Sequence, residues 1–232
     1  MRINKMLSNY GYCSRKDARV LIEDLRLEIN GELAMQGQWV EETDSILLDG
    51  KPLTKKPPLY FLYHKPKGVL STMDQDKENS LYHKLVFEDY VFPVGRLDQD
   101  SEGLILLTND GDLAQKILSP KFHHEKEYLV TVNRELTLEF LEKMGQGVDI
   151  NIGVTKPCEV KRVSDHQFKI ILTQGLNRQI RRMSKALGYQ VTKLIRLRIL
   201  NLHLRELPCG ECRPLDDKEL EDLKKSLHVN LD

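Results

Sequence analysis

Apolar residues in the first 55 positions recur first with helical spacing and then in short strand-like runs. One helix is predicted at the N-terminus, ending near Gly11. Ser14 is a good N-cap for a second helix that runs to about Leu25, with Leu25 on its buried side. The turns Asn30-Gly31 and Asp49-Gly50 lie between short apolar runs, which is a strong hairpin signal. The pattern therefore predicts a small α and β unit over residues 1–55.

The rest of the chain, residues 59–232, alternates strand-like and helix-like segments after the paired prolines of Lys55-Lys56-Pro57-Pro58. Strands are predicted at 59–63, 104–108, 128–132 and 168–173, and helices at 112–118, 136–144 and 179–187. Strands and helices mixed in this way, with long loops, favour an α+β fold over a regular doubly wound sheet.

Composition narrows the class of protein. Forty per cent of the residues are apolar and thirty per cent are charged, a composition typical of soluble globular proteins. No apolar run approaches the ~20 residues of a membrane span, and the N-terminus has no apolar signal core. We expect a cytoplasmic protein with reduced thiols at its four cysteines.

Charge is balanced over the chain but segregated along it, with 35 basic and 35 acidic residues in total. Residues 156–205 carry twelve Lys or Arg against two acidic residues, and residues 1–19 carry five against one. Segregated basic faces are typical of proteins that bind a polyanion. The five basic residues of the N-terminal segment are Arg2, Lys5, Arg15, Lys16 and Arg19.

One carboxylate, Asp98, stands between an apolar run and the polar turn at 99–103. If residues 94–98 are extended, alternation places Arg96 and Asp98 on one face, where both side chains line the same cleft. The alternative is that Asp98 only caps the turn, as aspartate often does.

Two further segments carry residues unusual for pure packing. Tyr128 enters a strand from a charged turn, although a half-buried core tyrosine is the commoner explanation. Segment 174–183 is a glycine-led helix start with Arg178, Arg181 and Arg182. A helix start combined with arginines favours anions.

Residues 1–55 resemble the S4 RNA-binding domain of ribosomal proteins and RNA-modifying enzymes. The matching segments are 2–7 (RINKML), 11–18 (GYCSRKDA) and 29–31 (ING). The chain departs from the family at Leu25-Arg26, a turn where glycine is usual. The resemblance implies RNA-backbone contacts from two helices, through Arg2, Lys5, Arg15, Lys16 and Arg19.

Residues 59–232 resemble the catalytic domain of the RsuA family of ribosomal RNA pseudouridine synthases, and look most like the RluF subgroup. The matching segments are 94–98 (VGRLD), 124–130 (HEKEYLV) and 175–183 (GLNRQIRRM). Because the family pairs this domain with an N-terminal S4 domain, the resemblance covers nearly the whole chain. It implies a mixed, mainly antiparallel sheet with flanking helices.

The resemblance also implies roles for single residues. Asp98 matches the essential aspartate, Tyr128 the tyrosine that lies against the target base, and Arg181 the basic residue that pairs with the aspartate. Arg96 matches an arginine that helps to hold the flipped nucleotide. Further RNA contacts are expected beside the cleft and on the arginine-rich helix, at Lys65, Lys67, Arg178 and Arg182.

The implied reaction breaks the N1–C1′ bond of uridine, turns the uracil over and joins C5 to C1′. It requires no redox change, metal or cofactor. It does require an ionised carboxylate that acts as nucleophile or base, and an arginine partner would keep the carboxylate ionised. The residue pattern leaves three roles open for Asp98: attack at C1′, attack on the base, or removal of a sugar proton.

The implied partner is a stem-loop of large-subunit ribosomal RNA, with a transfer RNA anticodon loop as an alternative, bound by a monomer. A competing hypothesis is a non-catalytic RNA-binding factor in ribosome assembly, which would have little need of Asp98, Tyr128 and Arg181 together. A glycoside-processing enzyme would require a second carboxylate opposite Asp98. Asp100 and Glu102 are poor candidates because both lie in the turn that follows it.

The pair Cys209 and Cys212 has the Cys-x-x-Cys spacing of a zinc half-site or a redox pair. A second half-site is missing from the sequence, since Cys13 and Cys158 stand alone. We therefore expect no metal site.

Overall fold

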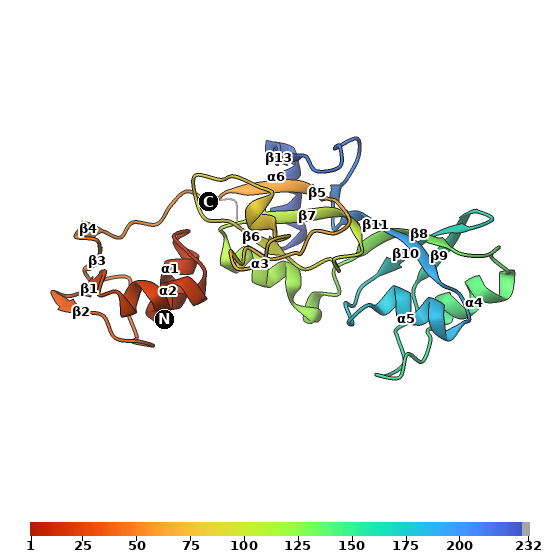
Figure 1. The fold of residues 1–232 in the computed structure, drawn as a ribbon, viewed down its shortest axis with the longest axis horizontal. Coiled ribbons are helices and arrows are strands. Elements are labelled where there is room, and N and C mark those ends of the chain that lie inside the picture. The colour runs from red at the N-terminus through yellow and green to blue at the C-terminus, as the bar shows by residue number, and fades with distance from the viewer. Residues whose placement is uncertain (229–232) are drawn as a thin grey trace.

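The computed structural model describes residues 1–228 (Figure 1). Residues 1–52 form their own sheet and their own apolar core, built on buried residues such as Ile3, Leu7 and Ile22. The sheet has the order β2-β1-β3-β4, and all its pairings are antiparallel. Its elements are α1 (Ile3–Asn9), α2 (Arg15–Glu23), β1 (Leu27–Ile29), β2 (Glu32–Leu33), β3 (Ile46–Leu48) and β4 (Lys51–Pro52).

Local sequence signals explain most of this part. The Ser14 hydroxyl accepts a hydrogen bond from the Asp17 amide at 3.1 Å, which confirms it as the N-cap of α2. Asn30-Gly31 and Asp49-Gly50 have positive φ and turn the chain between paired strands, as predicted. The prediction for Leu25 was wrong: α2 ends at Glu23, and Leu25 takes a φ of 57° and is 63 % exposed. It occupies the left-handed position after the helix that glycine usually fills.

The second part is organised on a mixed sheet with the order β13-β5-β7-β11-β8-β10-β9, with β6 paired to β7 and β12 to β11. In the described chain the pairing of β7 with β11 is parallel and the other pairings of this sheet are antiparallel. The strands are β5 (Tyr60–Lys65), β6 (Phe92–Val94), β7 (Glu102–Thr108), β8 (Lys126–Val132), β9 (Glu159–Ser164), β10 (Gln167–Leu172), β11 (Val191–Ile199), β12 (Leu202–His203) and β13 (Cys212–Pro214).

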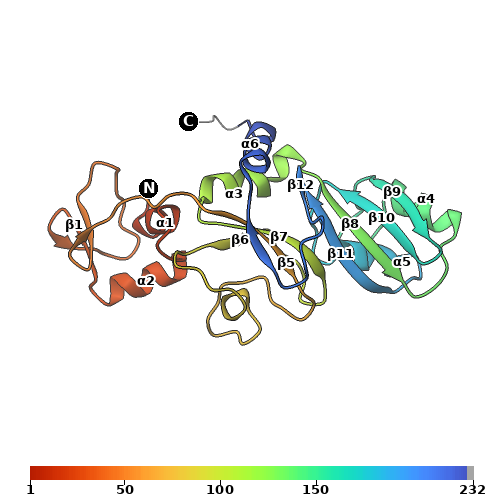
Figure 2. The same ribbon diagram turned by 90° about the horizontal axis from the view of Figure 1, so that it is seen from above.

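The helices cover the two ends of this sheet (Figure 2). Those near β5 and β7 contribute to one core, and those near β8 and β10 contribute to another. Along β10, Phe168, Ile170 and Leu172 are buried and alternate with outward residues, as its period-two pattern predicts. The helices are α3 (Gly111–Leu118) and α6 (Asp217–Ser226) at the first end, and α4 (Leu138–Gln146) and α5 (Gln179–Ala186) at the second.

The centre of the sheet depends on a close approach between β7 and β11. Gly103 lies opposite Arg196 with a φ of 119°. A Cβ at this glycine would lie 2.4 Å from the amide nitrogen and the carbonyl oxygen of Arg196. Only glycine fits here.

The mixed sheet with helices agrees with the α+β prediction, but strand β11 was not predicted. It carries Lys193, Arg196 and Arg198 among its apolar residues, so it lacks a clean alternation. Strands β9 and β13 and helix α6 were also not predicted. Among residues 1–228, no helix combines the length and the apolar character needed to cross a membrane.

Candidate active site

Asp98 lies in the loop between β6 and β7 rather than in a strand, because β6 ends at Val94. Residues 94–98 are therefore not one extended segment, and the condition for the alternation argument is not met. Arg96 and Asp98 nevertheless line the same cleft, as predicted, and the buried Leu97 between them lines it too. The Ser71 hydroxyl donates to the Leu97 carbonyl at 2.7 Å and accepts from the Leu97 amide at 3.1 Å. This pair of hydrogen bonds fixes the loop to the core.

A cleft of about 880 Å³ opens beside this loop. Its walls come from the Asp98 loop, from β8, from β11 and from the start of α5. Its lining includes six Lys or Arg and one acidic residue, so its charge is strongly positive. The acidic residue is Asp98, and the basic ones are Arg96, Lys126, Lys156, Arg178, Arg181 and Arg196.

Two arginines from the start of α5 approach the Asp98 loop. Arg178 forms a bidentate pair with Asp100 at 3.0 and 2.9 Å, and its Nη1 lies 3.8 Å from Asp98 Oδ2. Arg181 donates to the Asp100 carbonyl at 2.9 Å, and its Nε lies 3.5 Å from the Asp100 carboxylate. The Arg178 hydrogen bonds lower the pKa of Asp100.

The predicted pairing of Arg181 with Asp98 therefore differs from the structure, where Asp98 meets Arg178. The cause is the geometry of the helix start. Arg178 is the N-cap residue of α5, and its left-handed backbone, with a φ of 51°, differs from that of the helix that follows. Arg181 lies one turn further on, where its guanidinium reaches the far end of the loop at Asp100 and Ser101.

Tyr128 lines the cleft from β8, directly opposite Arg196 of β11. Arg196 is 2 % exposed, and its Nε donates to the Leu104 carbonyl at 2.7 Å. Its Nη1 also lies 3.4 Å from the carbonyl of Arg96. Burial lowers the pKa of Arg196, and the neighbouring Tyr128 hydroxyl opposes this shift. Arg196 was not predicted as a site residue, although a lone arginine in the apolar run 194–197 was a usable signal.

Lys65 was predicted to contact RNA, but its position in the structure does not allow this. Its side chain is fully buried, and its ammonium donates to the carbonyls of Pro66 at 2.9 Å and Val69 at 2.7 Å. Burial lowers the pKa of Lys65 to about 8. Lys65 thus holds the 65–68 turn together, whereas Lys67 is exposed. The turn contacts the Asp98 loop through a 2.7 Å hydrogen bond from the Gly68 amide to the Gln99 carbonyl.

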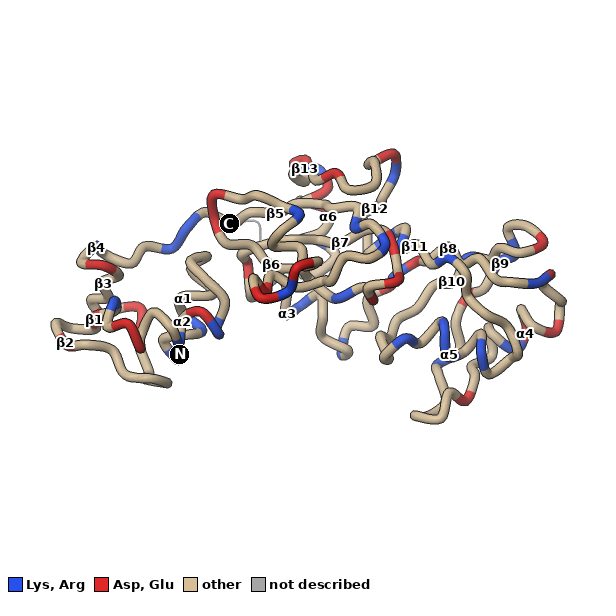
Figure 3. The backbone as a smooth tube through the Cα atoms, viewed as in Figure 1, with Lys and Arg blue, Asp and Glu red and all other residues tan. Residues whose placement is uncertain are grey.

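The remaining predicted RNA contacts lie outside the cleft lining. Arg182 donates to the Asn177 side chain at 3.3 Å. On α2, Arg19 pairs with Glu23 at 2.8 Å, and Lys16 lies 3.6 Å from Asp76. Figure 3 shows basic residues along α5 at one end of the molecule and around α1 and α2 at the other. The members of the N-terminal set are Arg2, Lys5, Arg15, Lys16 and Arg19.

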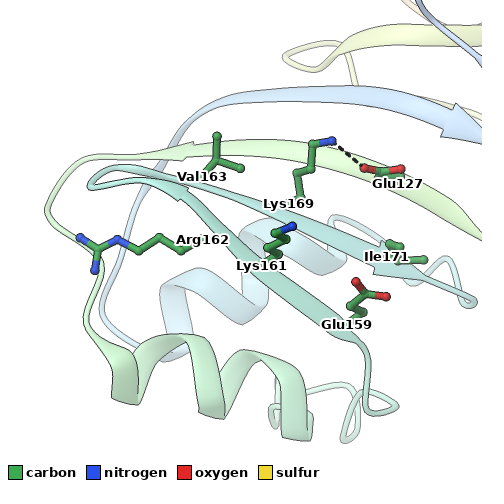
Figure 4. A pocket seen from close by; sticks show the side chains of 7 residues that line it. All are labelled: Glu127, Glu159, Lys161, Arg162, Val163, Lys169 and Ile171. Carbon is green, nitrogen blue, oxygen red and sulfur yellow. Dashed lines mark ion pairs between the residues drawn. The ribbon is translucent and has the colours of Figure 1, made fainter.

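A second hollow, of about 440 Å³, lies on the opposite face of strands β8, β9 and β10 (Figure 4). Glu127 points into it from β8, where it neighbours Tyr128 in sequence but faces away from the cleft. It pairs with Lys169 at 3.1 Å. Arg162, on the rim, pairs with Asp165 at 2.8 Å. This hollow is lined by largely compensated charges and a few apolar side chains.

Comparison with known proteins adds independent information. Residues 59–186 match the model of the RNA pseudouridylate synthase family. The chain is 45 % identical to the dual-specificity RNA pseudouridine synthase RluF of Salmonella typhi, over 97 % of this chain and 78 % of the relative. It is 34 % identical to the ribosomal large subunit pseudouridine synthase B of Bacillus subtilis, over 96 % of this chain and 95 % of that one. A crystal structure of a pseudouridylate synthase superposes with a TM-score of 0.72 at 30 % identity, covering 96 % of this chain and 99 % of that chain.

Proposed function

Because the chain belongs to the RNA pseudouridylate synthase family, close to RluF in the RsuA group, we propose that the cleft around Asp98 is where it isomerises uridine. The reaction class, uridine to pseudouridine in RNA, comes with the family. The observation that carries the placement is the single carboxylate of a cleft whose other charged lining residues are basic.

The proposed chemistry begins with a nucleotide that has been flipped out of the RNA stack, since a stacked nucleotide cannot bring its N1–C1′ bond to a side chain. A cleft of about 880 Å³ has room for a flipped nucleotide. Arg96 is exposed at its rim and available to a phosphate of the flanking backbone. Basic side chains at this rim offset the cost of bringing a polyanion to a carboxylate.

Asp98 is the proposed catalytic carboxylate. Its side chain is 31 % exposed, so a nucleotide can reach it, and the guanidinium of Arg178 lies 3.8 Å from its carboxylate. Arg181 contacts Asp100 rather than Asp98, and it thereby holds the end of the loop that carries Asp98. The loop is thereby fixed at both sides of the carboxylate, which keeps Asp98 in one position during the reaction.

Tyr128 is the proposed surface for the detached uracil. Base stacking on an aromatic ring is worth ~1–3 kcal/mol in single-stranded nucleic acid sites. The ring is held by packing between two cores, and Arg196 behind it is fixed by the Leu104 carbonyl. Arg196 is thus a positioning residue for Tyr128 and for the Arg96 backbone.

The proposed substrate is a stem-loop of large-subunit ribosomal RNA, with a transfer RNA anticodon loop as a second target. Two relatives support this proposal by name, one as a dual-specificity RNA enzyme and one as a large-subunit enzyme. Residues 1–55 are the proposed S4-like RNA-binding domain, supported by exposed Arg15 and Lys16 at the start of α2. The chain is proposed to act as a monomer in the cytoplasm.

The test compares pseudouridine maps of total RNA from cells with and without the gene, using carbodiimide modification and primer extension. We expect a site in large-subunit ribosomal RNA to disappear on deletion and to return with the wild-type gene but not with Asp98→Asn. Purified protein added to deletion-strain RNA should restore the same site. An unchanged map, together with inactive purified protein on ribosomal and transfer RNA, would contradict the proposal.

A further inference from the structure

The Cys-x-x-Cys pair does not act as one unit in the structure. Cys212 lies in β13, paired with Tyr63 of β5, and is half-buried against the core. Cys209 lies in the exposed loop before it and meets two residues from other strands, His64 of β5 and Glu102 of β7. One donor atom from each of these three side chains lies within 4.8 Å of the other two.

The hydrogen bonding of His64 prepares one ring nitrogen for a cation. Its Nδ1 lies 2.8 Å from the Leu207 carbonyl. A carbonyl only accepts, so Nδ1 carries the proton and the Nε2 of the neutral ring keeps its lone pair. His64 is 9 % exposed, and its buried Nε2 has no hydrogen-bond partner. Metal-ligating histidines typically donate their second nitrogen to a carbonyl in this way.

The nearest neighbour of that lone pair is a carboxylate. His64 Nε2 lies 3.4 Å from Glu102 Oε1. Two acceptors lie this close only if a proton or a metal ion lies between them. A proton on either side chain would serve, and so would a metal ion. The neighbouring thiol of Cys209 distinguishes the two, since an ion pair has no use for a sulfur donor.

We propose that His64, Glu102 and Cys209 bind one Zn²⁺, with water as the fourth ligand. Nitrogen, carboxylate oxygen and thiolate together suit zinc, whereas magnesium and calcium take oxygen ligands. Tetrahedral zinc with bonds of about 2.0–2.3 Å places its donors about 3.3–3.7 Å apart. The donors need to close by only about 1 Å from their 4.8 Å limit.

The backbone around the site already holds the three donors in place. Strands β13, β5 and β7 are neighbours in the sheet. The cysteine loop is fastened to β5 by hydrogen bonds from the Gly210 amide to the His64 carbonyl at 2.9 Å and from the His64 amide to the Glu211 carbonyl at 3.0 Å. Only the exposed Cys209 side chain has to move.

The ion would fix the end of the Asp98 loop rather than take part in the isomerisation. Glu102 is the first residue of β7, immediately after that loop. Its other oxygen lies 3.5 Å from Lys193, an exposed partner that zinc would leave in place. The site is thus a bridge between three strands beside the cleft.

Zinc binding is measured directly on full-length protein treated with a chelator and then dialysed. Titration calorimetry with Zn²⁺ should show one ion per chain, and a saturating ion should raise the Tm by about 5 °C. Co²⁺ in place of Zn²⁺ should give a thiolate charge-transfer band. Cys209→Ser should lose this band and bind zinc at least about 100-fold more weakly.

The matched control is Cys158→Ser, which removes a half-buried cysteine of another core. It should bind zinc as the wild type does. Because Cys209 is exposed, its serine variant is expected to fold, and Glu102→Gln gives a second test at another ligand. Absence of stoichiometric binding tighter than about 100 μM would overturn the proposal and leave a His64–Glu102 ion pair. Equal binding by wild type and Cys209→Ser would also overturn it.

Discussion

Strands β8 and β10 separate two hollows that differ in charge and in volume. The cleft on one face is about twice the volume of the other and has six Lys or Arg against a single acidic residue. The hollow on the opposite face has three Lys or Arg against two acidic residues. Neighbouring residues of β8 supply both: Tyr128 lines the cleft and Glu127 the opposite hollow.

The comparison shows that a basic segment is not by itself a functional surface. Residues 156–205 supply basic side chains to both faces, because a strand sends successive residues to opposite sides. On the far face they meet Glu127 and Asp165 and are largely neutralised. In the cleft they outnumber the carboxylates, so a polyanion is attracted to the face that carries Asp98.

The largest expected effect is at the carboxylate that makes the cleft face distinct. Asp98→Asn keeps the shape of the side chain but removes its charge. We expect the rate of pseudouridine formation to fall by about 1000-fold or more, because no other acidic residue among residues 1–228 lines the cleft. Single-turnover assays on an RNA stem-loop measure the rate, and filter binding measures affinity. Normal activity in this variant would rule out Asp98 as the catalytic group.

Gly103 tests whether the two faces depend on the close contact of β7 with β11. An alanine Cβ would lie 2.4 Å from backbone atoms of Arg196, at a φ of 119°. We expect Gly103→Ala to lower the free energy of unfolding by about 2–4 kcal/mol. Chemical denaturation measures the change.

The control for Gly103 is Gly175→Ala, where an added Cβ has no atom within 4 Å. Its stability should stay within about 0.5 kcal/mol of wild type. If both alanine variants are equally stable, the close contact between β7 and β11 does not require glycine at position 103.

Tyr128 tests the aromatic wall of the cleft. Tyr128→Ala removes the ring and should slow the reaction by about 10- to 100-fold, the equivalent of ~1–3 kcal/mol of stacking. Tyr128→Phe keeps the ring and should be impaired much less. Single-turnover rates of the two variants measure the difference. If phenylalanine is as damaging as alanine, the hydroxyl and not the ring surface is what the reaction needs.

The elements of the fold that could be predicted from the sequence are those whose sequence signals lie within a few residues of one another. Ser14, the Asn30-Gly31 turn and the apolar run of the strand at 168–173 act within a few residues, and all three were predicted correctly. Strand β11 was missed because its basic residues interrupt the apolar pattern. Arg196 was missed together with this strand. Its burial depends on the parallel pairing of β11 with β7, a strand almost a hundred residues earlier in the sequence.

The candidate site shows the same limit. Asp98 and Tyr128 were predicted as site residues through the family resemblance of their segments, and both line the cleft, but the partner of Asp98 was assigned to Arg181 instead of Arg178. That choice depends on the left-handed backbone at Arg178, which no residue pattern announced. Likewise, spacing along the chain could not show that His64 and Glu102 lie beside Cys209.

The Asp100 pair predicts how the stability of the cleft face varies with pH. Arg178 lowers the pKa of Asp100 in the folded protein below its unfolded value. The pair therefore stabilises the fold above the unfolded value and is lost as pH falls through the folded one. We expect Asp100→Asn to be less stable than wild type at pH 7, with the gap closing below about pH 4. Urea denaturation across this range measures it. The gap for exposed Glu32→Gln should stay near zero throughout.

The smallest effect is expected on the opposite face, where Lys169 pairs with Glu127 at 3.1 Å. Lys169→Gln should change stability by less than about 1 kcal/mol and RNA affinity by less than about twofold, because Lys169 is half-exposed and its charge is already compensated by Glu127. Arg96→Gln removes one cation from the cleft rim instead. It should weaken RNA binding several-fold and lower the slope of log affinity against log salt by about one unit. Filter binding over a range of salt concentrations compares the two variants. Equal losses would mean that RNA contacts both faces of the sheet, and the functional distinction between the faces would fail.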